Sequence, residues 1–360
     1  MSALWGMSVA QLEAWARARG AGAGAARTLG RFLVARLAGR EQPTPARALL
    51  ALAERELQPA AALPEAEVVH DPDGTVRFAV KLADGNLIET VLIHQAESET
   101  RARARWTVCV SSQVGCTRGC TFCETGSLGL LRNLSAAEIV AQYALAARAA
   151  SGNQGVREGA EKLLGAGPPR NLVFMGMGEP LDNLEEVLQA IAVLREPVGF
   201  AVPERRITVS TVGIVPRMDE LYARGGASNV AVSLHALEPA VRRSLLPVAR
   251  KWPLADLRAA IARSPRPVLL QWTLISGVND RASDADALVE FARGLEVRVN
   301  LIPLNPGPRD DQRAPPPERS RAFQKRLLDQ GLRALLRLPH GQAVGGACGQ
   351  LAGARRNLRP

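Results

Sequence analysis

The alternation of apolar and polar positions divides the chain into distinct parts. Residues 7–38 carry apolar side chains at helical spacing on both sides of a Gly-Ala-rich turn, and the helical pattern returns up to about Leu57. Residues 65–93 change to a period of two broken by Asp-Gly turns, which is typical of an antiparallel meander. The pattern predicts a small helical accessory domain over 1–60 and a β-meander with a charged connector over 61–100.

From Trp106 onward the pattern repeats a strand, a loop and a helix. Ser135 and Glu138 form a capping box at the first helix of this series. Six such units favour an α/β fold, a parallel sheet curled into a partial (βα)6 barrel over 101–335, with its site at the carboxyl ends of the strands. We expect strands at 106–111, 171–175, 206–210, 229–233, 267–274 and 297–302, and helices at 136–149, 183–195, 216–224, 239–245, 283–293 and 317–331.

Two segments interrupt or follow this series. Gly152 to Pro169 is rich in small and charged residues and is expected to be an insertion loop. Residues 336–360 form a Gly-rich tail, which we expect to be mobile.

Charge alone leaves the partner open. The net charge is +10, and the sequence pI is about 10.2, so a polyanionic partner such as nucleic acid is favoured. Arginine supplies nearly all of this charge, because lysine occurs at only four positions. A chain so rich in arginine and alanine can also reflect genome composition.

Apolar runs and cysteine usage indicate the compartment. No run of about 18 apolar residues is present, and the first residues lack the apolar core of a secretion signal. Five cysteines cannot all pair in disulfides, which is typical of a reducing compartment. We therefore expect a cytoplasmic protein with no membrane association.

Three cysteines carry the strongest chemical signal. Cys116, Cys120 and Cys123 form a C-x3-C-x2-C motif between the first strand and the first helix of the barrel. Three thiolates on a four-iron, four-sulfur (4Fe-4S) cluster would leave one iron open to a small molecule. The alternative is a zinc site with Cys109 as the fourth ligand, since structural zinc takes four ligands. The spacing and the place between strand and helix favour the cluster.

The motif, followed by Gly176-Met-Gly-Glu-Pro180 after the second strand, resembles the radical S-adenosylmethionine (SAM) superfamily. The resemblance narrows to the RlmN/Cfr family of RNA adenine methyltransferases between about Glu89 and Leu351. Seven stretches carry it: VCVSSQVGCTRGCTFC, RNLSAAEIV, NLVFMGMGEPLDN, ITVSTVGIVP, VAVSLHALEPAVRRSLLPV, LIPLNP and GACGQL.

The resemblance implies a role for each matching residue. Cys116, Cys120 and Cys123 would hold the cluster. Cys348 would carry a methyl group as a covalent intermediate, Cys109 would be the second catalytic thiol, and Glu89 matches the family's proton acceptor. The SAM site would be formed by Gly178, Glu179, Ser210, Ser233, Leu234, His235 and Asn305.

The resemblance implies methylation of an adenosine ring carbon in RNA. The first choice is carbon 2 of an adenosine in 23S ribosomal RNA. Carbon 8 or a transfer RNA target is the alternative, and a non-catalytic iron–sulfur or zinc RNA-binding protein is the reading from a different class. The resemblance also implies an electron donor such as flavodoxin or ferredoxin. A Cys109–Cys348 disulfide would form at the end of a cycle. We expect a monomer.

Overall fold

The computed structural model describes residues 3–57, 63–95, 104–151, 168–225, 228–337 and 339–352. Nearly all of the insertion loop expected from Gly152 lies outside these residues. Among the described helices, none combines the length and apolar character needed to cross a bilayer.

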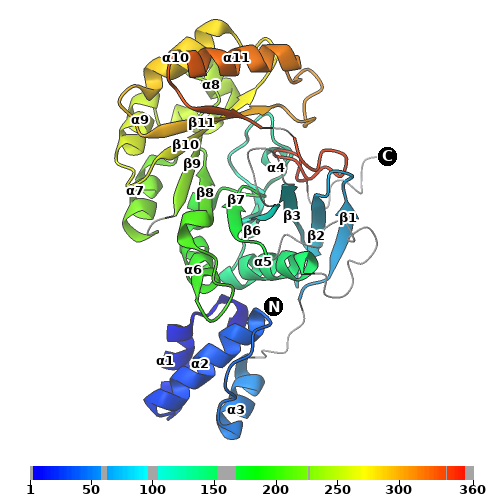
Figure 1. The fold of residues 1–360 in the computed structure, drawn as a ribbon, viewed down its shortest axis with the longest axis vertical. Coiled ribbons are helices and arrows are strands. Elements are labelled where there is room, and N and C mark those ends of the chain that lie inside the picture. The colour runs from blue at the N-terminus through cyan, green and yellow to red at the C-terminus, as the bar shows by residue number, and fades with distance from the viewer. Residues whose placement is uncertain are drawn as a thin grey trace.

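A ten-stranded sheet in the order β1-β2-β3-β4-β7-β8-β9-β10-β11-β12 forms the centre of the molecule (Figure 1). All six expected barrel strands are present and pair in parallel, which confirms the partial barrel. A seventh short strand, β12 (Ala334–Leu336), extends the parallel edge. The six strands are β4 (Arg105–Cys109), β7 (Asn171–Phe174), β8 (Ile207–Thr211), β9 (Asn229–Ser233), β10 (Val268–Leu274) and β11 (Val297–Pro303).

Helices follow the strands as the apolar spacing predicts. The expected helices are α5 (Ala136–Ala150), α6 (Leu184–Arg195), α7 (Val215–Arg224), α8 (Pro239–Leu245), α10 (Ala282–Ala292) and α11 (Pro317–Asp329). The structure adds α9 (Leu254–Ala262), the short α4 (Glu124–Ser127), and 3-10 turns at Ala3–Gly6, Pro180–Asn183, Glu204–Arg206 and Pro247–Arg250. A two-stranded hairpin of β5 (Gln113–Cys116) and β6 (Gly129–Asn133) encloses the three-cysteine motif.

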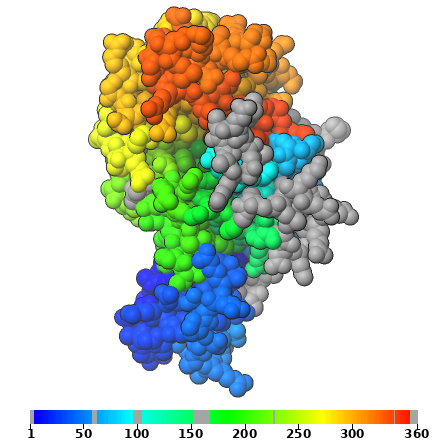
Figure 2. All heavy atoms as spheres, in the orientation of Figure 1, coloured from blue at the N-terminus to red at the C-terminus, as the bar shows by residue number. Residues whose placement is uncertain are grey.

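The N-terminal helices form a lobe at one end of the molecule (Figures 1 and 2). They are α1 (Val9–Arg17), α2 (Ala23–Leu37) and α3 (Arg47–Leu57). Polar contacts fix this lobe against α6 and its C-cap residue: Gln189 Nε2 donates to the Gly6 carbonyl at 2.8 Å, and Val9 N donates to Glu196 Oε1 at 3.0 Å.

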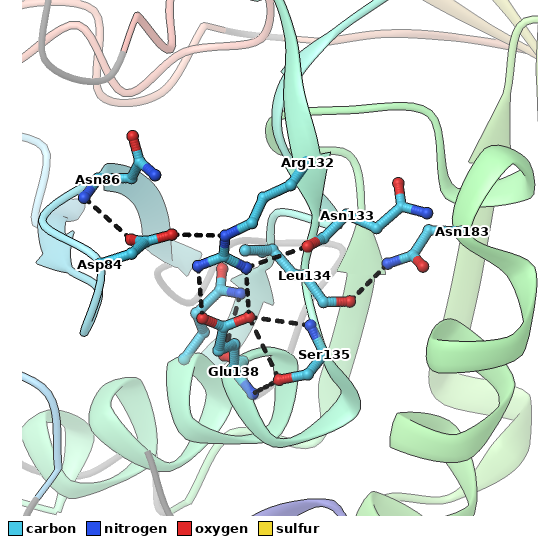
Figure 3. Close-up of polar contacts among 9 residues, drawn as sticks. Asp84, Asn86, Arg132, Asn133, Leu134, Ser135, Glu138 and Asn183 are labelled. Atoms are coloured by element: carbon cyan, nitrogen blue, oxygen red, sulfur yellow. Dashed lines mark hydrogen bonds and ion pairs between the residues drawn. The ribbon is translucent and has the colours of Figure 1, made fainter.

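The meander continues the central sheet. Its strands β1 (Ala66–His70), β2 (Val76–Lys81) and β3 (Leu87–Gln95) pair antiparallel, and β3 pairs antiparallel with β4. Arg132 on β6 connects this region to α5, as Figure 3 shows: it donates to Asp84 in the β2–β3 turn at 2.6 Å and to both carboxylate oxygens of Glu138. The capping box of Ser135 and Glu138 is confirmed.

The C-terminal segment differs from the mobile tail that its glycines suggest. Residues 339–352 fold back beside the meander and α4 (Figure 1). Thr125 Oγ1 donates to the Leu351 carbonyl at 2.6 Å, and Glu124 N donates to the Gly349 carbonyl at 2.8 Å. Local composition did not reveal this order because every one of these partners lies more than two hundred residues away in the sequence.

Candidate active site

The three-cysteine motif lies at the carboxyl ends of the parallel strands. Cys116 ends β5, and Cys123 directly precedes α4. All three cysteines line one cavity, which we call the upper cavity. Its other walls include Gly178, Glu179, Ser210, Ser233, His235, Asn305 and Cys348.

The thiols fit a cluster better than a single metal ion. Burial raises the pKa of Cys116 to about 12 and also raises the pKa of Cys120 and of Cys123. The negative charge of a neighbouring thiolate raises each pKa further: Cys123 acts on Cys116 and Cys120, and Cys348 acts on Cys123. Bound iron favours the thiolate and removes this penalty. Within the described ranges, no three His, Cys, Asp or Glu side chains converge as ligands of one ion. A 4Fe-4S cluster instead takes each thiolate on a different iron.

Gln113, the first residue of β5, holds the loop that carries Glu179. Gly178 has φ +99°, and a Cβ there would lie 2.6 Å from Cβ of Gln113, so only glycine fits. Gln113 Oε1 accepts a hydrogen bond from Glu179 N at 2.8 Å. The Glu179 side chain accepts from the backbone of Leu181 and Val212. Burial nevertheless raises its pKa to about 7. This carboxylate is therefore fixed in place and suited to meet a cationic group.

His235 is neutral and also fixed. Burial, with the nearby Arg242 charge, lowers its pKa to about 3. Its Nδ1 accepts from Thr273 N at 2.9 Å, so the ring proton is on Nε2. The structure brings Ser210 and Ser233 to the same cavity. Leu234 does not line it, because its side chain is fully buried in the core.

A second cavity, which we call the lower cavity, lies under the first and contains the other two cysteines. Its volume is about 280 Å³, and both Cys109 and Cys348 line it. Cys109 is 6% exposed, and burial raises its pKa, as does the neighbouring Cys348 charge. Cys348 lines both cavities and is reached by solvent there, yet the surrounding protein still raises its pKa, with Arg337 acting in the opposite direction. Cys109 does not line the upper cavity with the three cysteines of the motif.

Asn305 positions the Cys348 loop. Its Nδ2 donates to the Cys348 carbonyl at 3.0 Å, and its Oδ1 accepts from Gln342 at 2.7 Å. Because both the nitrogen and the oxygen of this amide form hydrogen bonds with the C-terminal segment, Asn305 fixes the position of Cys348 between the two cavities.

Glu89 lies elsewhere. It is fully buried, pairs with Arg77, and accepts a hydrogen bond from Ala352 N at 2.6 Å. It is absent from the walls of both cavities. The structure therefore places the Glu89 carboxylate against Ala352 of the C-terminal segment, outside the walls of both cavities.

Several residues that line the two cavities were not predicted from the sequence. Met175 and Gln271 line both cavities, and Arg206 and Thr208 line the lower one. The signal that could have found them is the period of two along each barrel strand, since every second residue faces the barrel interior.

Comparison with known proteins agrees with this geometry. The model of the Radical SAM superfamily matches residues 110–291. A "Probable RNA methyltransferase sce1580" of Sorangium cellulosum is 43% identical over 98% of this chain and 87% of its own length. The "Dual-specificity RNA methyltransferase RlmN" of Syntrophobacter fumaroxidans is 44% identical over 78% of this chain and 77% of its own. The crystal structure of a radical SAM methyltransferase from Sphaerobacter thermophilus matches with a TM-score of 0.82 and 37% identity, over 98% of this chain and 99% of that one.

Proposed function

The chain belongs to the radical SAM superfamily and, within it, to the RlmN-type RNA methyltransferases, and on that premise we propose that it methylates carbon 2 of an adenosine in 23S ribosomal RNA. The observation that carries the proposal is the position of Cys348. This thiol lies in the wall between the cavity of the three-cysteine motif and the cavity that contains Cys109. A protein that only bound RNA would need neither thiol.

Cys116, Cys120 and Cys123 would hold a 4Fe-4S cluster in the upper cavity, with SAM beside it. When bound, this pair supplies a 5′-deoxyadenosyl radical, which removes hydrogen from an otherwise unreactive methyl group. Glu179 would meet the SAM amino group, and Gly178, Ser210, Ser233, His235 and Asn305, which line the same cavity, would form the rest of the SAM site. The electron would come from a protein such as flavodoxin or ferredoxin in the cytoplasm.

The remaining chemistry belongs to the two thiols. Cys348, as thiolate, would accept the methyl group of one SAM molecule, with S-adenosylhomocysteine as the leaving group. After one hydrogen atom of this methyl group has gone to the deoxyadenosyl radical, its carbon would bond to the adenine ring, and the adduct would give up one electron to the cluster and the ring proton to a base, so that protein and RNA are joined through one carbon. Cys109 lines the same lower cavity and would attack the Cys348 sulfur as thiolate. The sulfur–carbon bond would break with its electron pair on the product carbon, which takes up a proton to become the methyl group, and the Cys109–Cys348 disulfide would then need reduction before the next cycle.

The test compares RNA from wild-type cells with RNA from cells that lack this protein. Nuclease digests of ribosomal and transfer RNA are separated by chromatography against 2-methyladenosine and 8-methyladenosine standards, because the two have equal mass. We expect loss of 2-methyladenosine from ribosomal RNA in the deletion strain. Loss of 8-methyladenosine, or of a transfer RNA product, would replace the proposed carbon or target. No change in either RNA would reject the function.

The first variant tests Cys348 directly. Cys348→Ala should bind about four irons, bind SAM as the wild type does, and transfer no methyl group to RNA when plasmid-expressed in the deletion strain. Ser127→Ala, at an exposed position of α4, serves as the control and should restore methylation. Full methylation by the Cys348 variant would contradict its role.

A further inference from the structure

We propose that the target nucleotide reaches Cys348 from the amino-terminal end of the parallel strands, through the lower cavity, with Arg205 and Arg206 binding RNA phosphates and Gln271 binding the adenine. The inference rests on the proposed function and adds the direction of entry and the residues that recognise the substrate.

The two cavities adjoin along the inner face of the sheet, where they share part of their walls. On β4, Arg105, Thr107 and Cys109 follow one another at intervals of two and all line the lower cavity. On β8, Thr208 lines the lower cavity and Ser210 the upper one. Five residues line both: Met175, Gln271, Ile302, Asn305 and Cys348.

This interior has room for a ligand. In a closed (βα)8 barrel, inward side chains fill the centre. Here Asn171 and Val173, the residues of β7 that line the lower cavity, are only half-buried, whereas Leu172 between them is fully buried in the core. The lower cavity, at about 280 Å³, approaches the usual size range of ligand pockets, roughly 300–1,000 Å³.

The bound cofactors would block access to Cys348 through the upper cavity. Cys348 has the upper cavity on one side and the lower cavity on the other. Because the cluster and SAM would occupy the upper side, the lower side remains for an adenine ring that must touch the same sulfur-bound carbon.

The charge of the lower cavity suits RNA. Among the described residues, its wall contains four arginines and no Asp or Glu. In the described part of the chain, Arg205, Arg206 and Arg337 form no ion pair with a carboxylate. Arg206 donates to Asn171 Oδ1 at 3.3 Å and Arg337 to Asn300 Oδ1 at 2.9 Å, both neutral acceptors. Arginine binds phosphate in bidentate fashion, and Arg205 and Arg206 are exposed at the amino-terminal end of β8.

Gln271 supplies the recognition element near the thiol. Its side chain is 8% exposed, and its Nε2 contacts Met175 Sδ at 3.5 Å. Its Oε1 accepts no hydrogen bond from any described residue, although the amide is nearly buried beside Cys348. An amide oxygen of this kind accepts from the 6-amino group of adenine. RNA-binding proteins recognise the hydrogen-bonding groups of bases that are unstacked from their neighbours. Binding of the 6-amino group by Gln271 therefore suits a nucleotide that is inserted from an RNA loop.

The arginine test measures binding of an unmodified ribosomal RNA transcript to the cluster-loaded protein at several salt concentrations. The slope of log affinity against log salt should fall by about 0.7 for each arginine that contacts phosphate, so Arg205→Ala/Arg206→Ala should lower it by about 1.4. The control is Arg321→Ala, an exposed arginine on α11 with no ion pair among the described residues, and it should leave the slope close to wild type. RNA-independent SAM cleavage by Arg321→Ala, which lines neither cavity, should also stay at the wild-type value.

The Gln271 test uses transcripts that carry purine, which lacks the 6-amino group, at the target position. On the adenine transcript, Gln271→Leu should have a kcat/KM roughly tenfold to a hundredfold below that of wild type. Replacing adenine by purine should lower the kcat/KM of wild type by the same factor. The same replacement should lower the kcat/KM of Gln271→Leu only slightly. A merely structural role would give equal losses on both bases.

Three outcomes distinguish failure of the proposed function from failure of the proposed route of entry. If wild type makes no methyladenosine, the proposed function fails. If it does, but the double arginine variant keeps its salt slope, the proposed entry is wrong while the function stands. Equal sensitivity of Gln271→Leu and wild type to removal of the 6-amino group would overturn the assignment of Gln271.

Discussion

At the scale of single residues, the two thiols outside the cluster motif differ in their surroundings. Cys109 is buried in β4, and Cys348 is open to both cavities. A reactive thiol that accepts a methyl group needs access, and Cys348 has it. A thiol that acts only after the substrate has bound can remain covered, as Cys109 is.

The Cys109→Ala variant should stall after coupling to RNA. Cys348 would still take up the methyl group and join it to the adenine, but no thiol would remain in the lower cavity to break the link. The adduct should run as a slow, nuclease-sensitive band on a denaturing gel, joined through Cys348. Normal turnover without an adduct would make Cys109 a core residue.

Glu89 should act by positioning the tail. Glu89→Gln leaves the 14% exposed Arg77 without its buried partner, which typically costs about 3–5 kcal/mol in the free energy of unfolding. It also weakens the acceptor for Ala352 N. We expect faster alkylation of Cys348 by iodoacetamide in the apoprotein, measured by mass spectrometry, with the exposed Glu67→Gln as the control. Lost methylation with unchanged stability and alkylation would instead indicate direct action on the substrate.

At the scale of elements, the Arg132 contacts join β6, α5 and the β2–β3 turn (Figure 3). Although burial alone would raise it, hydrogen bonds from Arg132 and Ser135 hold the pKa of Glu138 below its usual value. A lowered carboxyl pKa stabilises the fold above the unfolded-state pKa, which is about 4.3, and that stabilisation disappears as the pH falls through the folded-state value.

The stability lost in Glu138→Gln should therefore be largest near pH 7 and shrink as the pH falls below about 4.3. Urea unfolding at a series of pH values measures it. Glu290→Gln, which removes an exposed pair with Arg293, should change stability by less than about 1 kcal/mol throughout. A pH-independent loss for Glu138→Gln would show that its charge contributes nothing.

The elements that the sequence predicts well are those whose signals are local. Helix α5 has its capping box, and the barrel strands have apolar runs followed by amphipathic helices. The β5–β6 hairpin was missed because its strands are short and surround a cysteine loop without alternation. The folded tail was missed because Asn305, Thr125 and Glu124 bind it through backbone carbonyls, which leave no pattern in the tail itself.

In the candidate site too, residues with a local sequence signal were predicted and residues placed by distant contacts were not. Sequence motifs placed Cys116, Glu179 and Cys348 in one cavity, because their neighbours in the chain fix the loops that carry them. They did not reveal that Glu89 lies outside the cavity walls, or that Gln271 lies within them. Both facts depend on the register and curvature of the assembled sheet, which no short segment determines.

At the scale of the whole molecule, positive charge is present both in the lower cavity and on the N-terminal lobe. Residues 3–57 hold eight arginines against four glutamates, and several of these arginines pair with the glutamates. Arg31 and Arg47 are exposed and form no ion pair with a described carboxylate. Because the lobe lies at one end of the molecule (Figure 2), it would contact RNA away from the reacting nucleotide.

The lobe should therefore contribute affinity without contributing to chemistry. Arg31→Gln/Arg47→Gln should lower the affinity for a ribosomal RNA transcript and reduce its salt slope by about 0.7 per lost phosphate contact. The rate of methyl transfer at saturating RNA should stay at the wild-type value, since neither residue lines a cavity. Single-turnover kinetics at several RNA concentrations separate the two effects. A lower saturating rate would mean that the lobe helps to place the nucleotide at Cys348, and an unchanged affinity would remove the lobe from RNA binding.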